Sequence, residues 1–570
     1  MLRLAAHRAR SKVLPIAVSV GRGHQRSLSS HIVTSPFPDV PPGPYPTLDK
    51  FVTENWGNVD PNKVACLDGI TEEQRTFGEV RKDMDSVAFQ FSEMGIKRGD
   101  AIALMSPNHV DYATIIFAAA KIGAIVTPMN PLYTPEELAF QLKSSSAKTY
   151  VFHEDCFEQA DKAAKIYGAV DNMVVLGNGG ASFDSPVVNF SALREANHPE
   201  AATKQYHAEA SDTLLLPYSS GTTGLPKGVV LDHDNIVVNL HQMEACDNVF
   251  QTEDTITISP LPMFHIYGFS VSLLQQAWSG RTLVTMKNFD FNRYCELVDS
   301  YSKQNVQMRS HLVPPIVLGL AKNPVIDNYD FSGMDMIICA AAPLKPELEK
   351  EAAARLNCKI KQAWGMSELS PVGTCTPDDD LQAGSGTIGP LCANTEGKII
   401  DPETGEDLPL ETEGELCIRG PQVMQGYLEQ PEKTKECITD DGWLLTGDLA
   451  KYDERGYFYI LDRLKELIKY KGFQVAPAEL EDVLMSHPEI ADSTVIPVEN
   501  DEAGEVPRAY VVLAEGSSMS EADIQEYVAT KVAPHKKLRG GVVFTEAIPK
   551  TASGKILRRV VIAQDREERK

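Results

Sequence analysis

A glycine- and hydroxyl-rich segment of the chain has the composition needed to bind a phosphate group. Residues 217–229 read PYSSGTTGLPKGV and include three glycines, four serine or threonine hydroxyls and Lys227. Glycine lets backbone N–H groups approach an anion closely, the hydroxyls donate further hydrogen bonds, and the lysine supplies positive charge. Apolar runs at 214–216 and 229–231 predict buried strands on both sides, so we interpret the segment as a phosphate-binding loop rather than a linker. It is not a Walker A loop, because no serine or threonine follows Lys227.

Three later segments combine small or apolar residues with one polar or aromatic group. His265 lies in the apolar run 261–269, where it is either a hydrogen-bonded core residue or part of a site. The segments 339–344 (CAAAPL) and 362–368 (QAWGMSE) place small residues beside a polar or aromatic group. Such segments suit the wall of a pocket for a flat ring, although each alone is also compatible with a tight turn.

The first 38 residues differ in composition from the rest of the chain. They contain no Asp or Glu, and their six basic residues are interleaved with Leu, Ala, Val and Ser. This composition is typical of an organellar transit peptide, whereas the apolar run 13–20 is short for a secretory signal. We predict a mitochondrial leader over residues 1–38 that is cleaved near 26–30, with a cytoplasmic location as the second choice.

The composition of the 570-residue chain indicates a globular protein with several domains. Its net charge of −25 argues against a nucleic-acid partner. The ten cysteines include no C-x-x-C pair, which indicates reduced thiols and no metal framework. No apolar stretch reaches the roughly 18 residues of a transmembrane helix, and no feature predicts a particular oligomeric state.

After a proline-rich lead-in, strand-like runs alternate with amphipathic helical segments. Residues 100–105 and 125–128 have strand character, and 134–143 predicts a helix that begins at a Thr-Pro-Glu-Glu cap. This alternation predicts an α/β fold with helical layers on a largely parallel sheet. Beyond residue 400, short β-like runs separated by turns predict a small β subdomain that ends at Asp462-Arg463.

The remaining segment, 463–570, predicts a smaller α+β domain. Pro477 opens a helix, 493–498 is strand-like, and the side chains at 520–523 predict the cap of another helix. We therefore assign residues 39–462 to a large N-terminal domain with several subdomains and residues 463–570 to a C-terminal domain.

Four motifs, taken in order along the chain, resemble those of the adenylate-forming acyl-CoA synthetases, and most closely those of the 4-coumarate:CoA ligases. They are the loop 219–228, the run 414–420, the charge-rich segment 462–474 and the Ser-Gly-Lys at 553–555. Taken alone, the charge-rich segment could be a solvated connector and the basic C-terminal stretch a solvated end. The resemblance covers nearly the whole chain after residue 45 and implies that the C-terminal domain is mobile.

The resemblance implies a ligase that joins a carboxylic acid to coenzyme A in two steps. The carboxylate attacks the α-phosphate of MgATP to form acyl-AMP and pyrophosphate, and the thiol of coenzyme A then displaces AMP. Position by position, the resemblance implies that the phosphates are bound by Ser219, Ser220, Gly221, Thr222, Thr223 and Lys227, the adenine by Gln362 and Trp364, a phosphate oxygen by Ser367, and the ribose by Asp448 and Arg463. Glu368 would serve Mg²⁺, a hard cation that prefers oxygen ligands.

Lys555 is the predicted catalytic cation of the first step, because nucleotidyl transfer needs mainly positioning and charge neutralisation at the α-phosphate. The resemblance implies that the C-terminal domain swings about Lys465. In the second step it would replace Lys555 by a face that contains Lys469, Lys471, Gly472 and Gln474. His265 would gate the acid pocket and orient the carboxylate.

The acid pocket is predicted, again by position, to be lined by Tyr267, Val271, Ala340, Ala341, Ala363, Pro371, Val372 and Cys375. Plant coumarate ligases carry glycine at the places of Ala340 and Ala363, and malonyl-CoA synthetases carry arginine at the latter. One added methyl in a fitted pocket is worth about 1 to 3 kcal/mol. The apolar, narrowed lining therefore favours a medium-chain or aryl-substituted acid over coumarate or a small dicarboxylate.

Two other functions stay open at this stage. An enzyme with the same first step could pass the acyl group to a carrier or oxidise it with O₂, as luciferases of the family do. A non-catalytic acyl- or nucleotide-binding protein is the third hypothesis, and the presence of Lys227, Glu368, Asp448, Arg463 and Lys555 argues against it.

Overall fold

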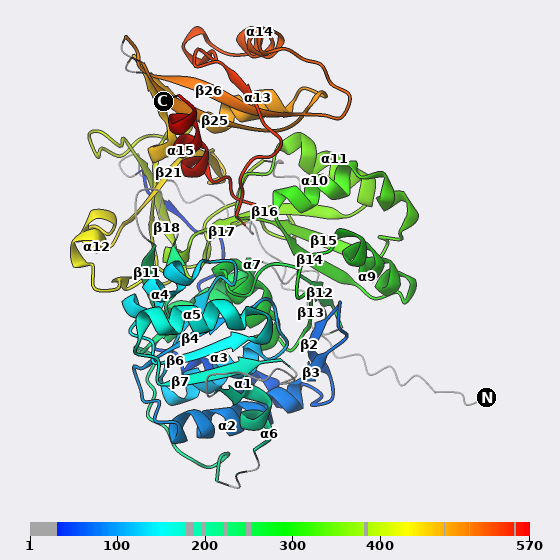
Figure 1. The fold of residues 1–570 in the computed structure, drawn as a ribbon, viewed down its shortest axis with the longest axis vertical. Helices are drawn as coiled ribbons and strands as arrows, with labels where there is room; N and C mark the ends of the chain where they lie inside the picture. Colours follow the sequence, from blue (N-terminus) through cyan, green and yellow to red (C-terminus); the bar gives the residue numbers. More distant parts are fainter. Residues whose placement is uncertain are drawn as a thin grey trace.

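The computed structural model describes residues 31–569, except 178–186, 197, 199, 220–225, 247–251, 253, 381–385, 472, 501 and 552–553. Figure 1 shows the C-terminal part of the chain, in orange and red, packed on one end of a larger N-terminal body. Most of the predicted leader and the centre of the predicted phosphate loop, including Ser220, Gly221, Thr222 and Thr223, lie outside the described residues.

Two large sheets form most of the N-terminal domain. One has the order β10-β11-β9-β5-β4-β6-β7-β8, and the other β17-β16-β15-β14-β12-β13-β2-β3. The first contains β10 (Tyr218–Ser219), β11 (Lys227–Asp232), β9 (Thr213–Leu215), β5 (Ile125–Met129), β4 (Ala101–Met105), β6 (Thr149–His153), β7 (Asn172–Leu176) and β8 (Val188–Asn189), and β20 (Gly426–Tyr427) pairs with β11. The second contains β17 (Val372–Cys375), β16 (Lys359–Gly365), β15 (Met334–Cys339), β14 (Met308–Leu312), β12 (Ile256–Ile258), β13 (Thr282–Thr285), β2 (Val64–Asp68) and β3 (Gln74–Thr76). The central pairs of both sheets are parallel, as predicted.

Helices cover both faces of the first sheet. The α-helices of this domain are α1 (Leu48–Asn55), α2 (Phe77–Glu93), α3 (Tyr112–Ile122), α4 (Pro135–Ser144), α5 (Phe157–Tyr167), α6 (Phe190–Glu195), α7 (His233–Cys246), α8 (Gln275–Trp278), α9 (Phe291–Lys303), α10 (Pro314–Lys322), α11 (Pro346–Leu356) and α12 (Pro431–Cys437). Short turns are η1 (Trp56–Asn58), η2 (Glu154–Cys156), η4 (Pro324–Asn328) and η5 (Ser367–Leu369). In Figure 1, α4 and α5 lie on one side of β4, β6 and β7, and α2 and α3 on the other.

The residues of β4 explain this two-sided covering. All five are buried: Ala103 and Met105 pack with α4 and α5, while Ile102 and Leu104 pack in the cluster that contains α2 and α3. Successive side chains of a strand point to opposite faces, so a continuous apolar run requires cover on both. The predicted cap of α4 is also confirmed, because the Thr134 hydroxyl accepts a hydrogen bond from the Glu137 backbone N–H.

A five-stranded sheet of order β1-β18-β19-β21-β22 forms the predicted β subdomain. Its strands are β1 (Val33–Thr34), β18 (Glu396–Ile400), β19 (Gly414–Arg419), β21 (Leu444–Tyr452) and β22 (Phe458–Arg463). The strand β1 lies inside the segment 1–38 that we assigned to the leader. Val33 is buried and pairs with Gly397 of β18, so the folded chain begins earlier than the predicted boundary at residue 39.

The C-terminal domain is a sheet of order β24-β23-β26-β25 with β27 beside β26 and three helices. Its elements are β23 (Ile468–Tyr470), β24 (Phe473–Val475), α13 (Pro477–Met485), β25 (Ile490–Asn500), β26 (Gly504–Leu513), α14 (Glu521–Lys531), η7 (Pro534–Lys536), β27 (Val542–Phe544) and α15 (Arg558–Glu568). The helices at Pro477 and after Ser520 begin as predicted. The charge-rich segment becomes the turn η6 (Leu464–Glu466) and the β23–β24 hairpin, so it is an integral part of this domain.

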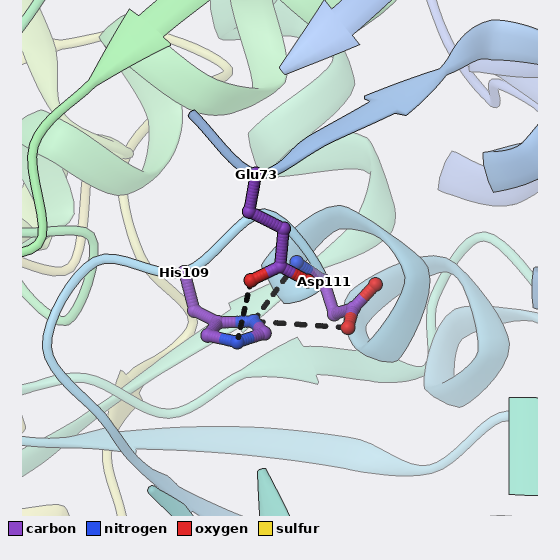
Figure 2. A group of neighbouring side chains, drawn as sticks. All are labelled: Glu73, His109 and Asp111. Carbon is purple, nitrogen blue, oxygen red and sulfur yellow. Dashed lines mark hydrogen bonds and ion pairs between the residues drawn. The ribbon is translucent and has the colours of Figure 1, made fainter. Parts of the chain in front are cut away.

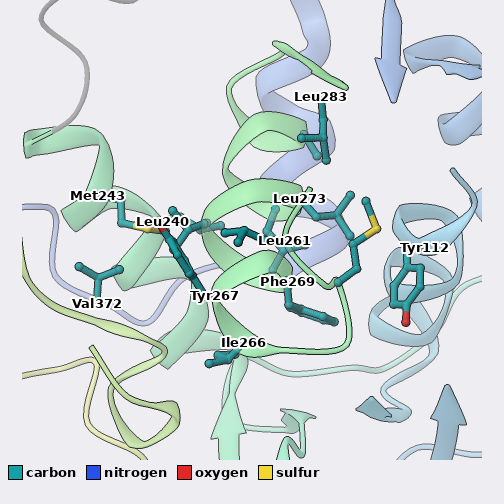
Figure 3. Close-up of a cluster of buried hydrophobic side chains, with 14 of the residues drawn as sticks. Tyr112, Leu240, Met243, Leu261, Ile266, Tyr267, Phe269, Leu273, Leu283 and Val372 are labelled. Atoms are coloured by element: carbon teal, nitrogen blue, oxygen red, sulfur yellow. The ribbon is translucent and has the colours of Figure 1, made fainter. Parts of the chain in front are cut away.

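The helix η3 (Tyr267–Leu274) is wound as a π-helix and runs through the centre of the N-terminal domain. All eight of its residues are buried, and Figure 3 shows Tyr267, Phe269 and Leu273 among the surrounding hydrophobic side chains. A π-helical turn inside a longer helix is uncommon and is often found at functional sites. Among the described residues, no helix is both long and apolar enough to cross a membrane.

A fully buried ion cluster ties β14 to β16. The Asp378 carboxylate accepts hydrogen bonds from Lys361 Nζ at 2.8 Å and from Arg309 Nη2 at 2.8 Å, and each of the three side chains is at most 1% exposed. Burial of an ion is costly unless oppositely charged groups accompany it. The buried Asp378 charge is therefore stabilised by both cations.

Replacing Asp378 by alanine should lower the free energy of unfolding by about 3 to 5 kcal/mol, because two buried cations lose their carboxylate. Urea denaturation of the full chain measures this. The matched control is Glu351→Ala, which removes the exposed partner of Lys322 and should cost less than about 1 kcal/mol. Equal losses in the two variants would contradict the prediction.

Candidate active site

A cavity of about 460 Å³ opens beyond the carboxyl ends of β15 and β16, between the two large sheets, the β subdomain and the C-terminal domain. In α/β folds, ligands bind at this end of parallel strands. Of the residues predicted to act on nucleotide, carboxylate or metal, it is lined by Ser219, Lys227, His265, Trp364, Ser367, Glu368, Arg463, Lys465 and Lys555. Residues more than three hundred positions apart therefore share one cavity.

The eight residues predicted to contact the acid all line the same cavity. The Tyr267 hydroxyl donates a hydrogen bond to the backbone carbonyl of Ile338 at 3.1 Å, which fixes the ring against β15. Ala341 has φ +74°, in the left-handed region that is unusual for a residue with a side chain. Such backbone strain is typically retained at ligand-binding sites.

The Asp448 carboxylate joins two residues of the cavity lining, Trp364 and Arg463. It is 2% exposed, and its two oxygens bind Arg463 Nε at 2.6 Å and Trp364 Nε1 at 3.0 Å. Burial raises the pKa of Asp448, and the charge of Arg463 opposes this rise. Because each carboxylate oxygen has two lone pairs, Asp448 keeps acceptor capacity for hydroxyl groups.

Lys555 reaches the cavity from a tight loop in front of α15. The Thr551 backbone N–H donates to the Lys555 carbonyl at 2.8 Å, and the Lys555 N–H donates to the Thr551 hydroxyl at 3.1 Å. Gly554 has φ +80°, and a Cβ there would lie 2.9 Å from Pro315 Cγ. Burial and the positive charge of Arg463 lower the pKa of Lys555, while Asp448 and Glu368 raise it. The loop thus places in the cavity a cation whose pKa is lowered on balance.

His265 lies at the start of η3 with part of its ring open to the cavity. Its Nδ1 accepts a hydrogen bond from the Tyr267 backbone N–H at 3.3 Å. Burial, and then the charge of Lys555, lower the pKa of His265 to about 4. His265 is therefore a neutral ring at the cavity wall at physiological pH, and not a purely internal core residue.

Glu368, Tyr427 and Lys227 also line the cavity and contact one another. The Tyr427 hydroxyl donates to Glu368 Oε1 at 2.9 Å, and Lys227 Nζ lies 4.2 Å above the Tyr427 ring. Glu368 offers the hard oxygen donor that Mg²⁺ prefers. One carboxylate is enough, because Mg²⁺ in nucleotide sites is held largely by water and phosphate oxygens.

Some predicted residues lie elsewhere. Gln362 is not among the cavity-lining residues, since its amide bonds to both backbone groups of Leu344, at 3.2 and 3.0 Å, and to Glu349 Oε2 at 2.7 Å. Lys469 and Lys471 are exposed on the β23–β24 hairpin. Gly472 lies outside the described residues, and so does the side chain of Gln474. The roles of all five residues stay predictions.

The sequence analysis missed several residues that line the cavity. The cavity is also lined by Met243 and Cys246 of α7, Gln275 of α8 and Ile338 of β15. Gln275 could have been found from the sequence, because Tyr267, Val271 and Gln275 are spaced four residues apart and so lie on one face of a helix. Tyr427 had no local signal, because only the pairing of β20 with β11 brings it beside Lys227.

A second cluster of titratable groups, Glu73, His109 and Asp111, lies outside the cavity (Figure 2). His109 is 3.9 Å from Glu73 Oε2 and 3.8 Å from Asp111 Oδ2. Arg75, however, binds Asp111 at 2.7 Å and Glu73 at 2.9 Å, and Arg194 adds a contact to Asp111 at 3.3 Å. With two guanidinium groups already neutralising the carboxylates, the cluster is an ion-pair network that joins β3, α6 and the loop before α3.

Two family models match the chain. The model for AMP-binding enzymes covers residues 53–428, and the model for the C-terminal domain of AMP-binding enzymes covers residues 479–555. A 4-coumarate–CoA ligase 5 of Oryza sativa subsp. japonica is 40% identical over 535 residues, which are 93% of this chain and 96% of that protein. The 4-coumarate–CoA ligase 1 of Petroselinum crispum is 40% identical over 534 residues, with the same shares covered.

Solved structures show the same architecture. The ATP-bound MatB of Rhodopseudomonas palustris matches with a TM-score of 0.79 and 26% identity, over 92% of this chain and 100% of that one. A Mycobacterium tuberculosis fatty acyl CoA synthetase matches with a TM-score of 0.69 and 27% identity, over 91% and 98%. These matches confirm the resemblance inferred from the four motifs. The chain belongs to the AMP-binding enzyme family.

Proposed function

We propose that the protein is an ATP-dependent carboxylic acid:CoA ligase that forms acyl-AMP and pyrophosphate and then acyl-CoA and AMP. The observation that carries this is the position of Lys555, a C-terminal-domain cation inside the cavity that Asp448, Arg463 and Glu368 line or support. The family membership and the 4-coumarate–CoA ligase relatives support the same reaction. ATP and coenzyme A are its co-substrates.

In the first step the chain's own groups act mainly by charge and position. The ribose hydroxyls would bind at Asp448, which retains lone pairs, and the β- and γ-phosphates at Lys227 and the adjoining loop. The Lys555 ammonium would neutralise charge that develops between the α-phosphate and the attacking carboxylate, a contribution that a desolvated site makes strong. The neutral His265 ring would border the carboxylate without adding a second positive charge there. Bound Mg²⁺ would supply further neutralisation of the phosphates, with Glu368 as its protein ligand.

In the second step, Lys555 would have to leave so that the thiol can reach the acyl carbon. We propose that the C-terminal domain rotates about Lys465, which lines the cavity in the turn η6 at the start of that domain. Lys469 and Lys471 are exposed in the present arrangement, and the rotation would bring them to the cavity.

The acid is proposed to be aryl-substituted or of medium chain length. The pocket beyond His265 is built largely from apolar side chains, including Val271, Val372 and Ala363. This lining favours an apolar body behind the carboxylate and disfavours a second carboxylate.

Lys555→Ala should lower acyl-AMP formation by about 100- to 1000-fold while ATP binding persists, because a transition-state contact is lost and the rest of the nucleotide site remains. Carboxylate-dependent pyrophosphate exchange across a panel of acids measures the first quantity and identifies the acid. The control is Lys550→Ala on the same stretch, where the lysine pairs with Asp492 outside the cavity. Full exchange activity in Lys555→Ala would refute the assignment, and AMP release that does not require coenzyme A would indicate another acyl acceptor.

As the pH is raised, the rate of acyl-AMP formation should fall at a lower pH than the pH at which a free lysine loses its proton. Lys555 must be cationic, and its lowered pKa means that the charge is complete at lower pH and is lost as pH rises toward the ordinary value of 10.5. Lys555→Arg should move this alkaline limb upward, since arginine stays protonated. His265, with a pKa of about 4, should cause no loss of rate near pH 6.5. A limb unchanged by Lys555→Arg would contradict the assignment.

We also propose a mitochondrial location, because residues 1–38 combine six basic residues with no acidic one. Residues 1–40 fused to a fluorescent protein should direct it to mitochondria. The same fusion with the six basic residues changed to glutamine should stay in the cytosol. Cytosolic fluorescence of the unchanged fusion would contradict the proposal.

A further inference from the structure

A lysine of the N-terminal domain contacts a helix of the C-terminal domain. Lys345 is the residue before α11, and its Nζ donates to the Asp482 carbonyl at 3.0 Å and lies 3.1 Å from Asp482 Oδ1. Asp482 belongs to α13, and Figure 1 shows α11 at the edge of the N-terminal body next to the C-terminal domain. The proposed rotation of the C-terminal domain must break this contact, because its two partners belong to different domains.

The contact is made at the end of α13 that favours a cation. Asp482 lies in the last turn of α13, where its carbonyl also accepts a hydrogen bond from the Ser486 N–H at 3.1 Å. Carbonyl groups in the last turn of a helix carry partial negative charge, so an ammonium group is favourable there. Lys345 therefore binds α13 through a carboxylate, a carbonyl and the helix dipole together.

The opposite end of α13 is also held from the N-terminal domain. The buried Asp462 carboxylate accepts a hydrogen bond from the Ala478 N–H at 2.9 Å. Because Pro477 has no N–H, Ala478 provides the first donor of the helix, and a carboxylate is favourable at a helix N-terminus. Asp462 is only three residues before Lys465, the proposed pivot. Lys345 is distant from the pivot along the chain, so its contact resists the rotation independently of the adjoining segment.

On the C-terminal side, the contact is connected to the segment that contains Lys555. Glu481 is the neighbour of Asp482 on α13, and its Oε2 accepts a hydrogen bond from Arg558 Nη2 at 2.6 Å. Arg558 follows Lys555 by three residues. A displacement of α13 would therefore be passed on to Lys555 through this ion pair.

On the N-terminal side, Lys345 is fixed to the wall of the cavity. It follows Leu344, whose N–H donates to Gln362 Oε1 at 3.2 Å and whose carbonyl accepts from Gln362 Nε2 at 3.0 Å. Gln362 belongs to β16, in which Ala363 and Trp364 line the cavity. The contact thus joins the segment that contains Lys555 to a strand of the cavity wall.

We propose that Lys345 is a positioning residue for the first step: by binding the end of α13, it holds the C-terminal domain in the arrangement in which Lys555 lies in the cavity. Lys345 is not among the residues that line the cavity, so it acts through Asp482 and α13 and not on the nucleotide. The inference rests on the proposed ligase function and names the residue that favours the first arrangement over the second. The second step requires Lys555 to leave, so it does not need this contact.

The test separates the two half-reactions in the full-length protein. In Lys345→Ala, formation of acyl-AMP in a single turnover should slow by about 3- to 10-fold, because a partly exposed ion pair at a helix end contributes modestly. The acid is the one that gives the fastest pyrophosphate exchange. Conversion of supplied acyl-AMP and coenzyme A to acyl-CoA should be unchanged or faster, whereas a general folding defect would slow both half-reactions.

Charge reversal tests whether the contact itself is responsible. Lys345→Glu places a carboxylate beside Asp482 and should slow acyl-AMP formation more than Lys345→Ala does. Addition of Asp482→Lys should restore most of the lost rate, since the charges are again opposite. The matched control is Lys536→Ala, because Lys536 pairs with Glu479 of the same helix at 2.5 Å but lies within the C-terminal domain. This variant should leave both half-reactions unchanged.

Hydrogen exchange of the protein without substrates measures docking independently of any reaction. The Ala478 N–H is bonded across the domain boundary, so peptides that contain it should exchange faster in Lys345→Ala and not in Lys536→Ala. If no acid supports acyl-AMP formation in the unchanged protein while this exchange depends on Lys345, the ligase function is refuted and the docking contact is retained. Equal slowing of both half-reactions, failure of the charge reversal to restore the rate, or unchanged exchange at Ala478 in Lys345→Ala would overturn the positioning role.

Discussion

The buried carboxylate of Asp448 joins the parts from which the site is built. It lies on β21 opposite Arg463 of β22, and it also binds the indole N–H of Trp364 on β16. The β subdomain and the second large sheet therefore meet at one ion. A buried carboxylate is stable only when such partners surround it, so the strand pairing and the positions of both side chains are mutually dependent.

The charged groups around Asp448 also act on Lys555 of the C-terminal domain. Asp448 and Glu368 stabilise the Lys555 cation, whereas burial and Arg463 destabilise it. The destabilising effects are the larger, since the pKa of Lys555 is lowered on balance, so its surroundings in the cavity disfavour the charged form of this side chain.

The helix η3 connects the hydrophobic core to the cavity. Its residues Phe269 and Leu273 lie among the hydrophobic side chains of the core (Figure 3), and Tyr267 and Val271 also line the cavity. Close packing along this helix leaves little free volume around it, so a change of one methyl group in the cavity lining alters the space available to a ligand.

The sequence by itself determined the α/β class, the buried strands β4, β5 and β9, and the cap of α4, because each depends on side-chain periodicity or on neighbours within one turn. The family resemblance also predicted eight residues that the structure brings together in the lining of one cavity. Only the tertiary structure decided which distant groups meet. Packing between elements, which no local pattern encodes, pairs β1 with β18 and brings Tyr427 to Glu368. It also bonds the Gln362 amide to Leu344 and Glu349 and leaves the oxygen of Gln275 unpaired among the described residues.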